Sequence, residues 1–137
     1  QPGKTLTVLD PVSENWERLV TTLIPHLFKA VAHNAAEHNQ LRFFEYGRIW
    51  DVTCADSEQK KLAGIIFDKK NTIDFYDAKA KIEALCTMLR LTIAWVKVDA
   101  PDKPWFAPYQ TALLMHNGQY VGIAGKVNPP LLHGMTE

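Results

Sequence analysis

The chain has 137 residues, of which 47% are apolar and 22% charged, and 15 basic and 15 acidic side chains give a formal net charge of zero. This composition is ordinary for a soluble globular protein, and a domain of this size buries roughly 70% of its unfolded surface. Zero net charge argues against a broad electrostatic contact with nucleic acid, and no apolar run approaches the roughly 18 residues of a membrane span. We expect one domain over residues 1–137.

The ends and the cysteines bear on the origin and location of the chain. The sequence begins "QPGKT" without Met and stops shortly after an apolar stretch, so we expect a piece of a longer polypeptide. No basic and apolar leader with a cleavage site is present. Two cysteines, Cys54 and Cys86, do not make a disulfide framework, and we expect both to be reduced thiols. The expected location is the cytoplasm.

The first half of the chain predicts an extended run, helical segments and a hairpin. Residues 5–9 are extended, and Asp10 or Ser13 in "DPVSEN" can cap the helical pattern that follows to about residue 38. Pro25 divides that pattern into a short turn and a helix from about Ile24 to Glu37. The segments "LRFFEYGRIWDV" (41–52) and "KKLAGIIFDK" (60–69) are strands joined by a polar linker, which predicts an antiparallel hairpin.

The second half predicts a helix, three strands and the start of a last helix. Asp74 can cap "DFYDAKAKIEALCTMLRL" (74–91), whose apolar stripe is Ala78, Ile82, Leu85 and Leu89. A strand over 93–100, a proline-rich connection over 101–110 and a hairpin over 111–127 with an Asn117-Gly118 tip follow. "NPPLLHGM" then begins a helix. The order predicts an α+β fold, with an antiparallel sheet flanked by helices.

Four blocks in this order carry a family resemblance. "LDPVSENWERLVTTLIPHLFKAVAHN", "LRFFEYGRIW", "DFYDAKAKIEALCTML" and "LLMHNGQYVGIAGKVNPPLL" resemble the beta chain of bacterial phenylalanyl-tRNA synthetase, from about Leu9 to Leu132. The resemblance implies a class II aminoacyl-tRNA synthetase-like module that is catalytically silent. It also implies packing against an alpha chain in an alpha2-beta2 ligase, which joins phenylalanine to tRNA(Phe) with ATP and Mg²⁺. No cofactor or metal is expected in this fragment, which alone is predicted to be inactive.

The chain departs from the family pattern at two places. Val20 stands where the family commonly has Arg. Residues 107–112 read Ala-Pro-Tyr-Gln-Thr-Ala where the family often has His-Pro-Gly-Arg-Ser-Ala, so that Ala107 and Gln110 replace a His and an Arg. Roles of those family residues are therefore not carried over to this chain.

The three charges of "LRFFEYGRIW" are consistent with a nucleotide site, an ion-pair scaffold or an interface. The resemblance to active class II synthetases implies an Arg-x-Glu pair on one face of a strand. Arg42 and Glu45 are three residues apart, so a regular strand directs them to opposite faces, with Arg42 beside Phe44 and Tyr46. This disfavours an ATP clamp. Interface candidates are Arg42, Glu45 and Arg48 in this strand, and Trp105 and Phe106 in the proline-rich connection.

Other sites remain as alternatives: a small α+β domain with its own nucleotide, metal or tRNA site. "GIAGKV" lacks the full phosphate-loop spacing and lies in a predicted strand, where small residues would allow the sheet to pack closely against a helix. His33 and Glu37 are one helical turn apart, but no third metal ligand follows at a characteristic spacing. Direct tRNA contact is disfavoured by the neutral charge.

Overall fold

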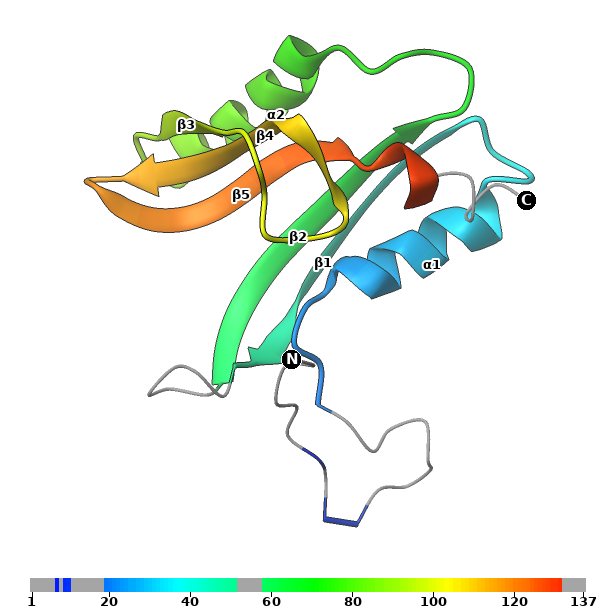
Figure 1. The fold of residues 1–137 in the computed structure, drawn as a ribbon, viewed down its shortest axis with the longest axis horizontal. Coiled ribbons are helices and arrows are strands. Elements are labelled where there is room, and N and C mark those ends of the chain that lie inside the picture. The colour runs from blue at the N-terminus through cyan, green and yellow to red at the C-terminus, as the bar shows by residue number, and fades with distance from the viewer. Residues whose placement is uncertain (1–6, 8, 11–18, 52–57, 132–137) are drawn as a thin grey trace. The chain divides into compact units, whose positions relative to one another are not determined.

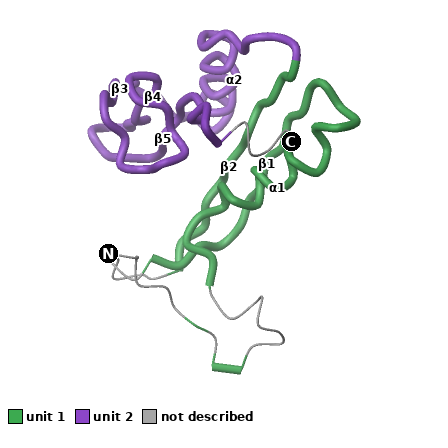
Figure 2. Tube along the Cα trace, turned by 45° about the vertical axis from the view of Figure 1, so that its right-hand side comes forward, with its two compact units in different colours: residues 1–69 green, residues 70–137 purple. Residues whose placement is uncertain are grey.

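The computed structural model describes residues 7, 9–10, 19–51 and 58–131 of the 137-residue chain (Figure 1). These fall into two compact units, residues 1–69 and 70–137 (Figure 2). The α+β class is confirmed, and its strands pair antiparallel in two sheets, one in each unit. That all 137 residues form a single domain stays a prediction.

Unit 1 contains the predicted helix, α1, over Ile24–Asn34. The helix begins where expected because Pro25 lies in its first turn, where a missing N–H removes no intrahelical hydrogen bond. It ends three residues before the predicted Glu37, and residues 35–37 form a turn. Residues 19–23 are not helical, so Asp10 does not cap α1, and Ser13 lies outside the described residues.

The predicted hairpin of unit 1 consists of β1, Gln40–Trp50, and β2, Glu58–Asp68. Its register is unbroken from the pair Gln40 and Asp68 to the pair Trp50 and Glu58. Odd-numbered residues of β1 face α1, which lies along the hairpin (Figure 1). The core cluster lies between this sheet face and the helix, and consists of Val31, Ala35 and Leu41, with Phe43, Ile65 and Phe67 packed against it.

Unit 2 contains α2, Phe75–Met88, and an antiparallel sheet of β3, Ala94–Val98, β4, Phe106–His116, and β5, Gln119–Val127, in the order β3-β4-β5. The predicted tip is confirmed, since Asn117 and Gly118 both have positive φ, as a type I′ turn requires. Residues 129–131 are helical, as predicted for the start of the last helix.

The proline-rich connection differs from the prediction. Strand β4 begins at Phe106, five residues earlier than expected, because Phe106 pairs with Val127 of β5. The register is irregular between Phe106 and Thr111, where Pro108 offers no N–H and Tyr109 has a φ of 62°. Residues 106–110 are therefore a bulged strand segment and not a loop.

Helix α2 begins after the predicted cap, since Asp74 accepts hydrogen bonds from the N–H groups of Tyr76 and Asp77. Its predicted apolar stripe is only half covered. Ala78 and Ile82 are half-buried, whereas Leu85 and Leu89 are exposed. Within the described part of the chain, no helix is long and apolar enough to cross a membrane.

Candidate protein interface

The three charged residues of β1 lie on both faces of the hairpin. Exposure alternates along the strand, so that Arg42 and Arg48 point away from α1 and Glu45 points toward it. No bulge interrupts the pairing with β2. The prediction that Arg42 and Glu45 lie on opposite faces is confirmed. The two side chains therefore cannot act together on one nucleotide at this strand.

Two of these charges have partners within unit 1. Glu45 Oε1 lies 3.3 Å from Nδ1 of His26 on α1, and Arg48 Nη1 lies 3.1 Å from Oε1 of Glu58 on β2. Both pairs are substantially exposed, so each contributes little to stability. No residue in the described ranges forms an ion pair with Arg42. The ion-pair interpretation thus accounts for Glu45 and Arg48 but not for Arg42.

Arg42 and Arg48 belong to a sheet face that carries exposed apolar side chains. Phe44 is 80% exposed and Tyr46 65%, and Leu62, which pairs with Tyr46, is 52% exposed. We call the side of the hairpin away from α1 the outer face; it consists of the even-numbered residues of both strands, among them Arg42, Phe44, Tyr46, Arg48, Glu58, Lys60, Leu62, Ile66 and Asp68. The prediction that Phe44 and Tyr46 share the face of Arg42 is confirmed.

Trp105 and Phe106 lie in unit 2, so they are not in the same unit as the charged candidates. Their rings are 6.5 Å apart between centroids, and both side chains are half-buried. The carbonyl oxygen of Trp105 accepts a 2.8 Å hydrogen bond from the N–H of Asn128. This local packing holds Trp105 beside β5, and an interface role for either aromatic stays a prediction.

The positions that depart from the family pattern have distinct surroundings. Ala107 is buried in the sheet of unit 2 and Gln110 is exposed. In unit 1, the carbonyl oxygen of Val20 accepts a 2.8 Å hydrogen bond from the N–H of Trp50. None of the three side chains is a charged or titratable group, so none could hold a phosphate or a metal by charge.

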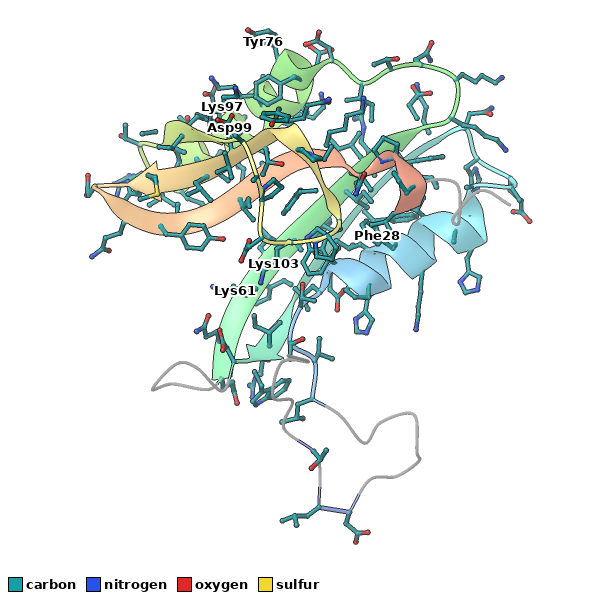
Figure 3. All side chains as sticks on the ribbon, viewed as in Figure 1. Phe28, Lys61, Tyr76, Lys97, Asp99 and Lys103 are labelled. Atoms are coloured by element: carbon teal, nitrogen blue, oxygen red, sulfur yellow. The ribbon has the colours of Figure 1, made fainter. Side chains whose placement is uncertain are left out.

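A second exposed apolar surface lies on α2. Tyr76 is labelled near the beginning of this helix in Figure 3, and Met88 is its last residue. Both are strongly exposed, and Leu85 and Leu89 lie with Met88 near the C-terminal end. Tyr76 and Met88 lie at opposite ends of the helix, so Tyr76 is separate from the apolar side chains at the C-terminal end.

The geometry gives little support for a metal or phosphate site. Among residues 7, 9–10, 19–51 and 58–131, no group of three or more His, Cys, Asp or Glu side chains could hold a metal ion. His33 is in α1, but Glu37 lies beyond the end of that helix, so the one-turn spacing of a metal pair does not apply. The segment "GIAGKV" lies within β5, as predicted, and not at a strand-to-helix turn.

An open hollow of about 400 Å³ lies at the C-terminal end of α2. It is lined by Glu83 and by residues 86–87 and 90–93. The carboxylate of Glu83 already accepts a hydrogen bond from Trp95 and pairs with Lys79 at 3.5 Å. Cys86 in its wall is a free thiol, as predicted, whereas Cys54 lies outside the described residues.

Comparison with known proteins assigns the chain to a family. A family model described as the phenylalanyl tRNA synthetase beta chain CLM domain matches residues 1–135. The phenylalanine–tRNA ligase beta subunit of Staphylococcus saprophyticus is 32% identical over 94% of this chain, and that of Nitrosococcus oceani is 28% identical over 93%. The chain spans only 17% of the length of either relative. It belongs to the phenylalanyl-tRNA synthetase beta chain CLM domain family.

Proposed function

We propose that this chain is a structural, non-catalytic module of a phenylalanine–tRNA ligase beta subunit, and that it packs against the alpha chain of an alpha2-beta2 enzyme. The observation that carries this proposal is the imbalance between core and surface. Among the described residues, 15 large apolar side chains are exposed and only 8 apolar residues are buried. A chain with so much uncovered apolar surface is suited to contact with other protein surfaces.

The catalytic part of the parent enzyme would lie elsewhere. The parent enzyme would join phenylalanine to tRNA(Phe) with ATP and Mg²⁺ in the cytoplasm. In the class II-like module proposed here, Arg42 and Glu45 lie on opposite faces of β1 and cannot clamp a nucleotide together. Isothermal titration calorimetry with ATP and Mg²⁺ tests this point. We expect no heat of binding, and micromolar affinity would overturn the silent role.

Complex formation with the alpha chain tests the structural role. The 137-residue chain would be mixed with the alpha chain of the same organism and examined by size-exclusion chromatography with light scattering. We expect a complex heavier than either component. Two separate peaks at concentrations well above micromolar would overturn the proposal, and the alpha chain mixed with an unrelated protein of similar mass serves as the control.

A further inference from the structure

The tip of the β4–β5 hairpin joins an asparagine to a glycine. Asn117 and Gly118 form this tip between the paired residues His116 and Gln119, and both tip residues are exposed. Their φ angles are 49° and 76°. A Cβ placed on Gly118 would meet no atom within 4 Å. The peptide group between the two residues therefore lies at the surface of its own unit.

The backbone nitrogen of Gly118 can react with the side chain that precedes it. Among the described residues, none accepts a hydrogen bond from the N–H of Gly118. In an Asn-Gly sequence this nitrogen attacks Cγ of the asparagine and closes a cyclic imide. Glycine favours the attack because it has no Cβ to crowd the ring and because its φ and ψ are the least restricted of any residue. An exposed tip reaches the required conformation by local opening, which costs little free energy.

The imidazole ring of His116 lies beside the nitrogen that would leave in this reaction. Its Nε2 is 3.2 Å from Nδ2 of Asn117, and its Nδ1 is 2.8 Å from the carbonyl oxygen of Thr92. A carbonyl oxygen only accepts hydrogen bonds, so Nδ1 carries a proton, and Nε2 of the neutral ring accepts a hydrogen bond from the Asn117 amide. An imidazole in contact with a leaving nitrogen is placed to exchange a proton with it.

We propose that Asn117 is a site of spontaneous deamidation, promoted by His116. A bond forms between the backbone nitrogen of Gly118 and Cγ of Asn117, and the bond from Cγ to Nδ2 breaks. The proton that the Gly118 nitrogen gives up passes through Nε2 of His116 to the departing nitrogen, which leaves as ammonia. Water then opens the cyclic imide at either carbonyl and yields aspartate or isoaspartate. The inference needs no molecule other than water, and it does not depend on the proposed function.

The products change both the charge and the backbone of the hairpin. Either product adds a negative charge to a chain whose formal net charge is zero. Isoaspartate also adds a methylene group to the main chain at the tip. A type I′ turn matches the twist of its two strands only with a two-residue connection. The isoaspartate product should therefore lose the pairing of His116 with Gln119.

The test follows the asparagines of the folded 137-residue chain during incubation at physiological pH and temperature. Digestion in acid followed by mass spectrometry measures the conversion of each one. Asn71 is the internal control, because it is also exposed in unit 2 but precedes Thr72, whose branched Cβ crowds the attack. We expect Asn117 to convert at least about tenfold faster than Asn71. Equal rates at the two positions in the folded chain would overturn the assignment of the site.

Two variants test the mechanism. Gly118→Ala adds a Cβ at the attacking residue and should slow the conversion of Asn117 at least about tenfold. His116→Gln removes the group that transfers the proton and should slow it at least about threefold. Circular dichroism checks that each variant keeps the fold. An unchanged rate in Gly118→Ala would overturn the imide mechanism, and an unchanged rate in His116→Gln would overturn the role of His116.

Discussion

Trp95 of β3 donates a hydrogen bond from Nε1 to Oε1 of Glu83 on α2, with 3.1 Å between the two atoms. The same indole ring lies 5.3 Å from Nζ of Lys79 and meets the ring of Phe75 edge-on at 6.1 Å. Three side chains of α2 thus converge on one residue of β3. Trp95 therefore joins the helix to the sheet of its own unit.

Replacement of Trp95 should destabilise unit 2. We expect Trp95→Ala to lower the free energy of unfolding by about 2 kcal/mol, because a half-buried aromatic ring is lost. Trp95→Phe keeps a ring and loses the hydrogen bond, at a cost of about 1 kcal/mol. Urea denaturation followed by far-UV circular dichroism measures both. Glu83→Gln keeps an acceptor oxygen and serves as the control, and a Trp95→Ala variant as stable as wild type would contradict the role of this contact.

The cap of α2 gives a second prediction. Asp74 Oδ1 accepts hydrogen bonds from the N–H groups of Tyr76 at 2.7 Å and Asp77 at 3.3 Å. Asp74→Ala leaves these N–H groups without the side-chain acceptor and should cost about 1 kcal/mol of stability. Asp74→Asn retains a capping oxygen and should cost little. Urea midpoints measure the loss of stability in each variant. Equal losses in both would show that the charge of Asp74, and not its capping hydrogen bonds, stabilises α2.

Sequence signals of one or two residues correctly predicted the features that depend only on residues adjacent in the chain. Asp74 caps α2, Pro25 lies in the first turn of α1, and Asn117-Gly118 forms the hairpin tip, as expected. Each of these features depends on the φ angle or side-chain oxygen of one or two residues. The alternation along β1 likewise placed Arg42 and Glu45 correctly on opposite faces.

Features that depend on distant partners were not predictable in this way. Strand β4 begins at Phe106 because Val127 pairs with it, and the sequence from 101 to 110 carries no local sign of that pairing. The exposure of Phe44 and Tyr46 is likewise set by α1, which covers the other side of the hairpin. Periodicity shows which side chains share a face, but not which of two apolar faces a helix will cover.

Tyr109 occupies a backbone conformation that suits glycine. Its φ is 62°. A non-glycine residue in the left-handed region costs about 1 kcal/mol of stability. The cation–π contact between Lys97 Nζ and this exposed ring, 5.9 Å from the ring centroid, stabilises the folded state by less than that cost. Lys97, labelled with Asp99 in Figure 3, also has that carboxylate as a partner at 3.0 Å.

Tyr109→Gly should therefore raise the free energy of unfolding by roughly 0.5–1 kcal/mol. The matched control is Tyr120→Gly, because Tyr120 is also an exposed tyrosine in the same sheet but has no positive φ. This control should lower stability, since glycine weakens a strand interior. Chemical denaturation of both variants tests the difference. A loss of stability in Tyr109→Gly as large as in Tyr120→Gly would contradict the prediction.

Gly125 is required by the close approach of β4 and β5. A Cβ at this position would lie 2.7 Å from Oγ1 of Thr111 and 2.9 Å from the carbonyl oxygen of Gln110. The expectation that glycine here allows a sheet to pack on a helix is therefore corrected, because the crowding comes from the neighbouring strand at its bulge. A backbone carbonyl cannot move aside as a flexible side chain can.

Gly125→Ala should lower the free energy of unfolding by about 1–3 kcal/mol, because the added methyl group forces β4 and β5 apart. Gly64→Ala is the control. A Cβ at Gly64 would lie 3.4 Å from its nearest neighbour, the carbonyl oxygen of Phe43, which is an ordinary contact. The control should be neutral or slightly stabilising, since alanine loses less backbone entropy than glycine. Equal effects of the two substitutions in thermal or urea unfolding would refute the crowding argument.

The ionisation of Tyr120 gives a prediction about alkaline pH. Partial burial of the phenol raises the pKa of Tyr120 above its usual value of 10.0, and the Asp102 carboxylate raises it further by repulsion. The folded state thus holds this proton more tightly than the unfolded state. The stability that Tyr120 contributes is fully present below pH 10.0 and is lost as the pH rises through the folded-state pKa.

Absorbance of the tyrosinate ion measures this titration directly. The difference between wild type and Tyr120→Phe isolates one of the four tyrosines. We expect its midpoint above pH 10.0, and we expect Asp102→Asn to move the midpoint downward without restoring it fully, because burial is the larger cause. Urea midpoints should fall less steeply above pH 10.0 in Tyr120→Phe than in wild type. A midpoint at or below 10.0 would contradict the burial of this phenol, and an unchanged midpoint in Asp102→Asn would remove the carboxylate from the explanation.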